Sequence, residues 1–294
     1  MKYRKIPPFR IGAFVGLGFA VSLTCAATPE AFLTIPNGAR ETAMGETGVS
    51  HARGGSAVWW NPALIALDGN KLEFQVFNWL LDGQGAFGAG GFRTSWGGIG
   101  GYYFNLNLDD FEIRDRPGPA QGSFTVHHSV LALGSSIKIS DAINAGLNWK
   151  CFYEKLYSSQ YSGSGLLDLG IAARWRNWRA GGVLTNYELW DYFKEELPLT
   201  TRLGIAYGED RGQIVWNASL EGVDVKGTDY FHLGIECGWL QTVFLRLGYM
   251  QGHSSRDLTY GLGLAKGRYR ADLALTPYDY GLGTVWRASI GVGL

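Results

Sequence analysis

Regular alternation of apolar residues with polar or small residues is the feature that most constrains this chain, because it recurs in segment after segment. Between Asn144 and Glu154, one face carries Ala, Leu, Trp, Cys and Tyr, and the other carries Asn, Gly, Lys, Phe and Glu. The ranges 168–176, 231–239 and 243–249 repeat the pattern. Only a β-strand separates side chains with a period of two residues. The sequence therefore predicts an all-β protein built from amphipathic strands.

Aromatic residues distinguish between two architectures that both alternate, a soluble sandwich and a membrane barrel. Trp149, Tyr153, Trp175, Trp239 and Trp286 all fall on the apolar faces, several of them near strand ends. Membrane barrels have an apolar outer face with aromatic girdles at both interfaces. The 43 glycines, together with the many aromatic residues and the lack of helix signals, fit the composition of transmembrane barrels. We therefore expect a transmembrane antiparallel β-barrel whose outer face contacts the lipid of the outer membrane.

The connections between the predicted strands alternate between tight and long, as they do in outer-membrane barrels. We expect about fourteen strands within residues 70–294, and an even number places both termini in the periplasm. Apolar residues alternate up to Leu294, which resembles the C-terminal signal of outer-membrane proteins. The longest expected extracellular loop, 105–122, is rich in charge. Its charged residues are Asp109, Asp110, Glu112, Arg114, Asp115 and Arg116.

The N-terminus predicts export from the cytoplasm. Four basic residues up to Arg10 precede an apolar run at 11–23, and Cys25-Ala26-Ala27 forms a small-residue cleavage site. The run is shorter than the roughly 20 residues that a membrane-spanning helix needs. A lipoprotein site at Cys25 is disfavoured because Thr24 stands where Gly or Ala is usual. We expect a signal peptide at 1–27, cleaved near Ala27.

Charge and motifs exclude several function classes. Cleavage removes four of the 26 basic residues and none of the 26 acidic ones, which leaves a net charge of −4 and argues against nucleic acid as a partner. The sequence has no His-Glu-x-x-His, no Gly-x-Ser-x-Gly and no cysteine pair at metal-ligand spacing, and His51, His232 and His253 are scattered. We therefore expect no enzyme activity, no catalytic residue, no cofactor and no metal site.

Residues 37–66, before the strands, look like neither a strand nor an ordinary helix. Small residues dominate them, and the stretch ends in a bulky, turn-forming sequence. Small residues let the backbone approach another surface closely. We expect residues 28–69 to form a plug inside the barrel. The residues of its motif are Met44, Gly45, Trp59, Trp60, Asn61, Pro62 and Ala63.

Alternation also directs charges of both signs into the lumen. Mixed charge favours ion pairs between plug and wall over ion selectivity. We expect Arg40, Glu41, Glu46 or Arg53 to pair with the wall, so that the plug closes the pore. The expected wall charges are Lys150, Asp168, Arg174, Arg202, Glu236, Arg246, Arg270, Asp272 and Arg287.

Two motifs of the plug carry a family resemblance. Ala43-Met44-Gly45 and Trp60-Asn61-Pro62-Ala63 resemble the PorV/PorQ family of outer-membrane proteins, which is similar to the FadL-type fatty-acid transporters with their Asn-Pro-Ala plug. Later stretches, including 197–204, 245–249 and 261–264, resemble the family as well. The resemblance implies a 14-stranded FadL-like barrel with its N-terminal segment in the lumen.

Two functions follow from this resemblance. PorV-like proteins carry exported proteins during type IX secretion, which implies an interaction protein for secreted cargo or secretion-system components that uses the charged loop 105–122. The alternative is FadL-like transport of a hydrophobic small molecule. It predicts an apolar pocket between plug and wall, with Trp59, Trp60, Phe152 and Phe244 lining it. The resemblance favours the first function.

Overall fold

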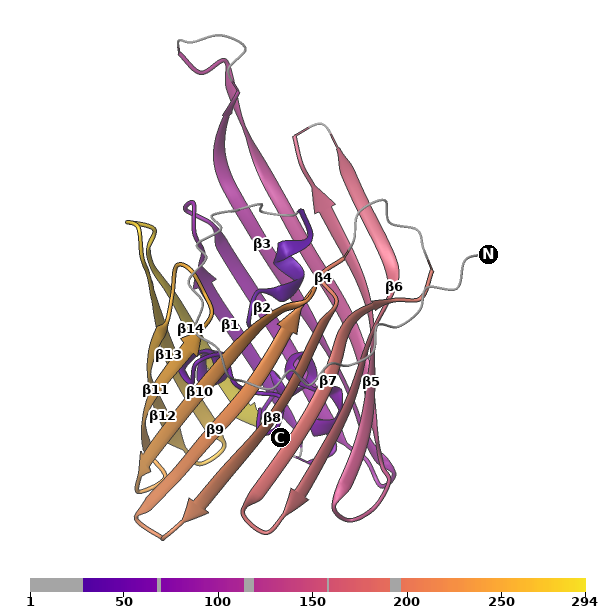
Figure 1. The fold of residues 1–294 in the computed structure, drawn as a ribbon, viewed down its shortest axis with the longest axis vertical. Helices are drawn as coiled ribbons and strands as arrows, with labels where there is room; N and C mark the ends of the chain where they lie inside the picture. Colours follow the sequence, from indigo (N-terminus) through magenta and orange to yellow (C-terminus); the bar gives the residue numbers. More distant parts are fainter. Residues whose placement is uncertain (1–28, 68–69, 114–118, 158, 191–196) are drawn as a thin grey trace.

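The computed structural model describes residues 29–67, 70–113, 119–157, 159–190 and 197–294. Within these residues, fourteen strands form one closed antiparallel barrel (Figure 1). The strands are β1 (Lys71–Asn78), β2 (Gln84–Arg93), β3 (Gly97–Ile113), β4 (Gly122–Lys138), β5 (Ile143–Lys155), β6 (Gln160–Trp175), β7 (Trp178–Glu188), β8 (Thr200–Asp210), β9 (Ile214–Val225), β10 (Thr228–Trp239), β11 (Val243–Gln251), β12 (Leu258–Lys266), β13 (Tyr269–Tyr278) and β14 (Gly283–Gly293). The predicted fold class and strand number are confirmed.

Each strand pairs with its neighbours in sequence, and the first strand closes the barrel on the last. β1 runs antiparallel to β14, from the pair Lys71 and Gly293 to the pair Phe77 and Arg287. Every strand therefore has two partners, and the closed sheet has no free edge.

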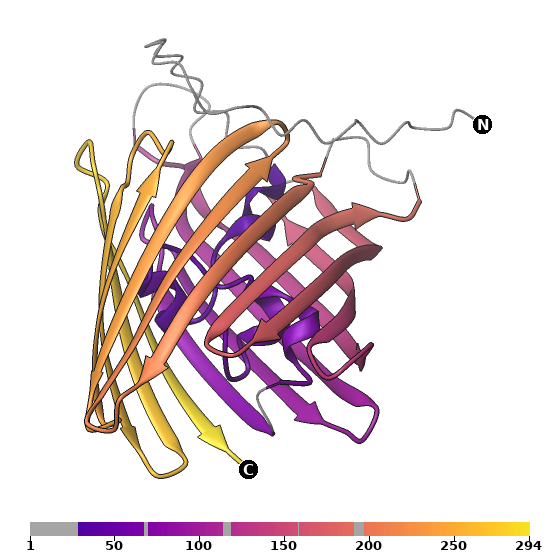
Figure 2. The same cartoon turned by 60° about the horizontal axis from the view of Figure 1, so that its bottom comes forward.

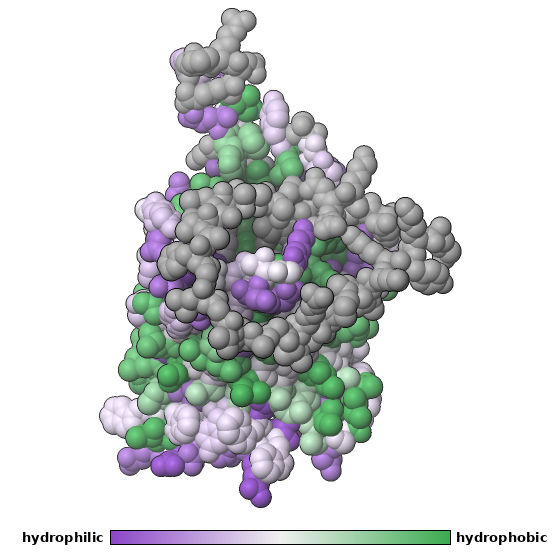
Figure 3. All heavy atoms as spheres, in the orientation of Figure 1, coloured by the Kyte–Doolittle hydropathy of each residue, from purple (hydrophilic) through white to green (hydrophobic). Residues whose placement is uncertain are grey.

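Alternation sorts the side chains between the two faces of the wall. On β4, Leu131 and Leu133 point outward and are 52% and 60% exposed, whereas the alternate residues Val130 and Ala132 are buried. Figure 3 shows hydrophobic residues spread over the barrel wall and hydrophilic residues gathered at its lower end. An apolar outer band of this kind is the surface that outer-membrane barrels present to lipid.

The two ends of the barrel differ in their connections. We call the end with the β3–β4, β7–β8 and β11–β12 connections the loop end, and the end with the β2–β3 and β12–β13 connections the turn end. The expected alternation of tight and long links was wrong at three places: the β5–β6 and β13–β14 connections have four residues each, no more than the β4–β5 connection of the turn end, and the β9–β10 connection is shorter still. β9 and β10 meet at the loop end through only two residues, Lys226 and Gly227. Both have positive φ, 51° and 83°, as a two-residue hairpin turn requires.

Much of the expected loop at 105–122 is strand. β3 continues to Ile113 and β4 begins at Gly122, so the two strands form a long hairpin that rises beyond the rest of the barrel (Figure 1). Phe111 and Phe124 stack across it, with ring centroids 5.4 Å apart. This part of the hairpin extends beyond the apolar band of the wall. Neither of its faces must therefore be apolar, and polar residues occur on both.

Residues 29–67, here called the luminal segment, lie inside the barrel (Figure 2). They contain two 3-10 helices, η1 (Pro29–Thr34) and η2 (Pro62–Leu64), and two short α-helices, α1 (Ala39–Ala43) and α2 (Ala57–Trp60). α1 contacts β11 to β14, α2 contacts β2 and β3, and η2 contacts β4 to β6. Helices this short gain their stability from such packing.

None of the helices in the described ranges is long and apolar enough to cross a bilayer.

Candidate functional site in the barrel lumen

Glycines on the inner face of the wall lie where the backbone of the luminal segment comes closest. A Cβ on Gly248 would come within 1.8 Å of the Gly45 nitrogen, and one on Gly234 within 2.3 Å of the Met44 carbonyl oxygen. A Cβ on Gly146 would lie 2.3 Å from the Ala63 nitrogen. Real Cβ atoms do not make such contacts, so backbone meets backbone at these points because the side chains are absent.

Asn61 ties the end of the luminal segment to the wall. Its Nδ2 donates to the carbonyl oxygens of Val49 and Ile171, at 2.8 and 3.0 Å, and its Oδ1 accepts from the Ala63 nitrogen at 3.0 Å. Pro62 begins η2, where its missing N–H costs nothing. The Asn-Pro-Ala sequence is thus a helix start whose capping side chain also contacts β6.

The two tryptophans occupy different environments. Trp60 is 1% exposed, its Nε1 donates to the Asn37 carbonyl oxygen at 2.7 Å, and the Arg202 guanidinium lies 5.0 Å from its ring. Trp59 packs edge-on against Trp60 but is only partly buried. Trp60 therefore belongs to the packed interior and Trp59 is less buried, and both side chains border the cavity described below.

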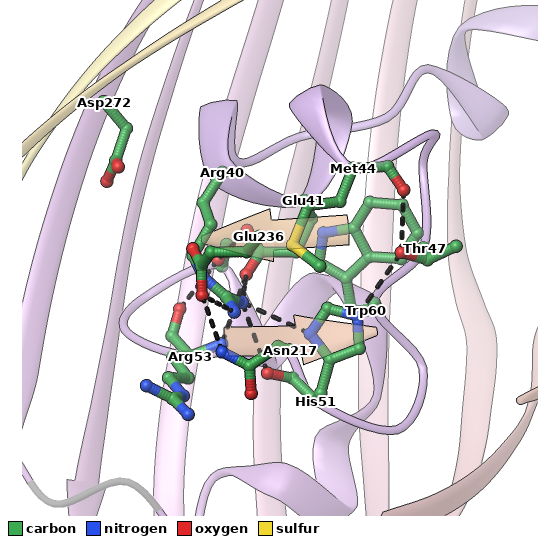
Figure 4. A network of polar contacts seen from close by, with 12 residues as sticks. Arg40, Glu41, Met44, Thr47, His51, Arg53, Trp60, Asn217, Glu236 and Asp272 are labelled. Atoms are coloured by element: carbon green, nitrogen blue, oxygen red, sulfur yellow. Dashed lines mark hydrogen bonds and ion pairs between the residues drawn. The ribbon is translucent and has the colours of Figure 1, made fainter. Parts of the chain in front are cut away.

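A charged cluster around Glu236 of β10 joins the luminal segment to the wall (Figure 4). Arg40 donates from Nε and Nη2 to the two carboxylate oxygens, at 2.9 and 2.8 Å. Arg246 donates to Oε2 at 2.7 Å, and Arg270 lies 3.3 Å from the same oxygen. Asp272 pairs with both Arg246 and Arg270, at 2.8 Å each. Buried charges need such multiple partners.

Glu221 of β9 forms a second anchor. Its Oε2 accepts from the backbone nitrogens of Gly48 and Val49, at 2.8 and 3.1 Å, and its Oε1 accepts from Arg202 Nη1 at 2.9 Å. Arg202 Nη1 also lies 3.3 Å from the Glu46 carbonyl oxygen. The turn at 46–49 is therefore fixed to β8 and β9.

Lys150 and Asp168 pair on β5 and β6, at a distance of 2.5 Å. Asp168 also accepts from the Asn186 nitrogen at 3.0 Å and from Asn148 Nδ2 at 3.1 Å. Asn148 Nδ2 reaches the Val58 carbonyl oxygen of the luminal segment at 2.7 Å. Both charges are thus satisfied within the wall and its nearest neighbours.

Two of the expected inward charges differ from the rest. Arg174 is exposed near the end of β6, because the strand carries it beyond the luminal segment toward the turn end, so its assignment to the luminal network was wrong. Arg287 is buried, donates to the Pro36 carbonyl oxygen at 3.2 Å, and lies 5.6 and 5.4 Å from the rings of Phe77 and Trp79.

The other half of the lumen, along β1 to β6, holds a large apolar cluster beside the polar contacts Lys150–Asp168 and His128–Glu154, and we call it the apolar half. Phe32, Leu33 and Ile35 at the start of the luminal segment fill it. The Phe32 ring stacks on His128 with centroids 4.5 Å apart and meets Phe152 at 6.0 Å. The other buried residues of this cluster include Val58, Ile65, Phe77, Phe87, Tyr102, Phe104, Leu106, Val130, Leu166 and Leu197.

Phe244 does not line this apolar half. It lies on β11 beneath two guanidinium groups, those of Arg270 and Arg246, at 4.8 and 5.8 Å from the ring. The expectation that Phe244 lines a hydrophobic pocket was wrong, because an inward aromatic ring can serve as a surface for cations.

A small cavity lies where the apolar and charged halves meet. It measures about 30 Å³, and its lining includes Leu33, Trp59, Trp60, Tyr102, Lys150 and Arg202. A volume of this size holds water, whereas pockets for small organic ligands are on the order of 300 Å³ or more. The luminal segment therefore fills the space that a ligand would need.

The charged residues expected in the longest loop are split by the fold. Asp109, Asp110 and Glu112 lie on β3, where Asp109 accepts from Thr125 Oγ1 at 2.8 Å. Arg114, Asp115 and Arg116 lie outside the described residues.

One pair of side chains was missed by the sequence analysis, which treated the histidines as scattered. His232 of β10 and His253 of the β11–β12 connection meet with their Nε2 atoms 3.0 Å apart. Next to them, Arg256 Nη2 pairs with Glu46 Oε2 at 2.9 Å. His232 and His253 are 21 residues apart in sequence, so no local motif could reveal the contact. In the described ranges, no group of three or more His, Cys, Asp or Glu side chains is placed to hold a metal ion.

Three solved structures share this architecture. The CymD monoaromatic hydrocarbon channel is 11% identical with a TM-score of 0.63, and the match covers 87% of this chain and 97% of CymD. The Pseudomonas putida toluene transporter TodX is 14% identical with a TM-score of 0.58, covering 87% and 96%. A Pseudomonas aeruginosa FadL homologue is 9% identical with a TM-score of 0.54, covering 86% and 97%.

At these identities the likeness shows the fold, which is that of the FadL-like outer-membrane barrels. No protein-family model and no curated protein matches the sequence. The comparisons thus show the wider FadL-like fold, and the finer PorV/PorQ resemblance stays a prediction.

Proposed function

We propose that this chain is an outer-membrane channel for a hydrophobic small molecule, and that the start of the luminal segment occupies the path of that molecule. The observation that carries the proposal is the apolar half of the lumen, which Phe32, Leu33 and Ile35 fill with side chains like those of a hydrophobic ligand. The shared fold with CymD and TodX, which are hydrocarbon channels, supports the same reading. This function replaces the secretion role as the preferred one.

The luminal segment divides into a fixed body and an end that is easier to displace. Residues 38–66 are held by the Glu236 and Glu221 clusters, by Asn61 and by backbone contact with wall glycines. η1 is a single stretch of 3-10 helix, and such helices are weak by themselves. Phe32 and Leu33 of η1 are held by apolar packing. An incoming apolar molecule can make the same contacts with the wall that these two side chains make.

Location and domain division belong to the same proposal. An apolar outer band and an outer-membrane fold support the outer membrane as the site of action. We assign residues 1–27 to a signal peptide, 28–69 to the plug and 70–294 to the barrel. The two ends of the barrel, at Lys71 and Gly293, then lie on the periplasmic side, the loop end faces outward, and the luminal segment begins toward the loop end, where Phe32 contacts His128.

A solute-binding experiment tests this function. Purified protein in detergent is titrated with N-phenyl-1-naphthylamine, an apolar probe whose fluorescence rises in apolar surroundings. Phe32→Ala empties part of the apolar half, so tighter probe binding than in wild type is expected. Phe74→Ala is the matched control, because Phe74 points outward and is 57% exposed. Equal probe binding by wild type, Phe32→Ala and Phe74→Ala would contradict the proposal.

A second candidate function, as a PorV-like carrier of secreted proteins, has one observation in its favour. The β3–β4 hairpin extends beyond the barrel and carries stacked aromatic rings, with Tyr157 5.1 Å from Phe124. Such a projection suits contact with another protein. Deletion of 109–124 should abolish co-purification of secreted proteins or secretion components if this function is correct, and should leave probe binding unchanged.

A further inference from the structure

The small cavity between the apolar and charged halves lies against the part of the luminal segment that we propose to be displaced. Leu33 and Thr34 of η1 belong to its lining, together with Trp59, Tyr102 and Lys150. Leu33 is also part of the cluster that fills the apolar half. A molecule that takes the place of Leu33 therefore has its apolar body among apolar side chains and one end in the cavity.

Tyr102 of β3 is buried in the apolar half and also borders the cavity. It is 5% exposed, and its ring packs against that of Phe87 with centroids 5.7 Å apart. Among the residues that the structure describes, none forms a hydrogen bond with its hydroxyl. Buried tyrosine hydroxyls usually have a hydrogen-bond partner. The Tyr102 hydroxyl is therefore available to a molecule in the cavity.

Lys150 of β5 stands close to Tyr102 on the inner face of the wall. Ala132 of β4 is paired with both residues, so only a methyl side chain separates them. Lys150 Nζ contacts Asn186 Oδ1 and Asp168 Oδ1, at 2.5 Å each. An ammonium group has three N–H donors. Within the described ranges the third donor has no acceptor, so two polar groups with bonding capacity border one cavity.

The charges of the lining disfavour an anionic molecule. Lys150 is already paired with Asp168, whose carboxylate also borders the cavity, and Arg202 is paired with Glu221 at 2.9 Å. An anionic head group would meet the Asp168 carboxylate, and both cations of the lining already have a counterion. A neutral group that forms hydrogen bonds avoids this cost.

The size of the cavity narrows the choice of polar group. It measures about 30 Å³, which is enough for one water molecule or one hydroxyl group. A carboxylate or a phosphate is larger. A hydroxyl also has both functions that the site requires, because its oxygen can accept from Lys150 while it shares a hydrogen bond with the Tyr102 hydroxyl.

We infer that the molecule carried by this channel is a small phenol or aromatic alcohol, whose single neutral hydroxyl binds to Tyr102 and Lys150 in this cavity. An aromatic body fits because the molecule takes the space of the Phe32 ring, which lies against the rings of His128 and Phe152. The inference rests on the proposed function and narrows its class of solute from any hydrophobic molecule to a hydroxylated one.

Competition binding tests the role of the hydroxyl. Full-length processed protein, as wild type and as Phe32→Ala, binds N-phenyl-1-naphthylamine in detergent at pH 7, where a phenol is neutral. The probe is then displaced by ethylbenzene, 4-ethylphenol or 4-ethylbenzoate, which share one apolar body. Tyr102→Phe should weaken the binding of 4-ethylphenol by about three- to tenfold, the effect of one hydrogen bond, and should leave that of ethylbenzene unchanged. Tyr103→Phe is the matched control, because Tyr103 follows on β3 but points outward and is 50% exposed.

The outcomes separate this inference from the proposed function. If Tyr102→Phe weakens 4-ethylphenol and ethylbenzene equally, or weakens neither, the cavity holds only water and the inference is overturned, while displacement of the probe by ethylbenzene still supports a hydrophobic channel. Tighter binding of 4-ethylbenzoate than of 4-ethylphenol would overturn the neutral head group. Absence of probe binding in both wild type and Phe32→Ala would contradict the proposed function itself, and this inference with it.

Discussion

Arg40 of the luminal segment and Glu236 of β10 form a bidentate ion pair, with Nε–Oε2 and Nη2–Oε1 distances of 2.9 and 2.8 Å. Both side chains are buried, and the same carboxylate also accepts from Arg246. A pair in this geometry fixes the angle of α1 as well as its position. The body of the luminal segment is thus locked to the wall, whereas Phe32 at its start is held only by packing, with its ring against His128 and Phe152.

Replacement of Arg40 with Met should loosen the luminal segment. Removal of one partner from a buried ion pair costs about 3–5 kcal/mol, because the other charge stays buried. We expect the variant to show larger single-channel conductance in planar bilayers than the wild type, which should be nearly closed. Arg211→Met is the control, since Arg211 is 72% exposed in its pair with Glu209. Matching conductance in Arg40→Met and wild type would refute this role.

A methyl group on Gly248 should prevent the luminal segment from docking. Its Cβ would meet the Gly45 nitrogen at 1.8 Å, and neither backbone can yield without loss of hydrogen bonds. Gly248→Ala should therefore expose the segment to limited proteolysis in folded, heat-modifiable barrels. Gly222→Ala serves as the control, because nothing lies within 4 Å of the Cβ position there. Equal protease resistance in the two variants would show that the close approach is unimportant.

The contact between Glu46 and Arg256 should fail only in acid. Burial by itself raises the pKa of Glu46, but the nearby basic groups together, Arg256 first among them, outweigh it and lower this pKa to about 2 from an ordinary 4.5. A carboxyl with a lowered pKa contributes stability that is complete above its ordinary pKa and is lost as the pH falls toward the folded value. Conductance should thus be constant from pH 8 to about 5 and rise below about 4.

Glu46→Gln provides the comparison for this acid effect. The neutral amide cannot form the ion pair, so its conductance at pH 7 should exceed that of the wild type and should change less on acidification. An acid response of the same size in Glu46→Gln would assign the effect to another group.

The two neighbouring tryptophans should respond differently to truncation. Trp60→Ala removes a buried ring and its bond to Asn37, at a cost of about 3–5 kcal/mol, so the luminal segment should be released at lower urea concentration. Trp59→Ala, beside the cavity, should change probe affinity more than urea resistance. Equal shifts in both measurements for both variants would argue against separate packing and lining roles.

Sequence periodicity was sufficient to predict the barrel. Residues that face lipid must be apolar, whereas the residues between them face the lumen and can be polar or small. The prediction from periodicity failed where a strand leaves the lipid or where its inner face lies away from the luminal segment. Asp109 and Glu112 looked like a loop because β3 there stands beyond the apolar band, where neither face must be apolar. Arg174 has inward parity but lies too close to the turn end to reach the luminal segment.

Contacts between distant residues were beyond the reach of periodicity. The pattern places Glu236 and Arg246 on the inner face, but it does not show that Arg40 is the residue that completes their cluster. The meeting of His232 with His253 depends on how the β11–β12 connection folds. Inward glycines such as Gly146, Gly234 and Gly248 are a further signal for docking, because the backbone of the luminal segment occupies the place of their missing side chains.

The central claim is that the start of the luminal segment moves while its body stays in place, and a pair of reversible crosslinks tests it most directly. In a background lacking Cys151 and Cys237, one variant carries Phe32→Cys with Phe152→Cys, and the control carries Thr47→Cys with Ser219→Cys. The Thr47 and Ser219 hydroxyl oxygens lie 2.7 Å apart, so that crosslink fixes a part that the account holds still. Each pair is oxidised to a disulfide or joined by a short reducible crosslinker, and uptake of N-phenyl-1-naphthylamine is measured in a Gram-negative host without FadL-like channels. Uptake should cease in the crosslinked Phe32 variant, return on reduction and stay unchanged in the control, whereas undiminished uptake through the crosslinked Phe32 variant would contradict the account.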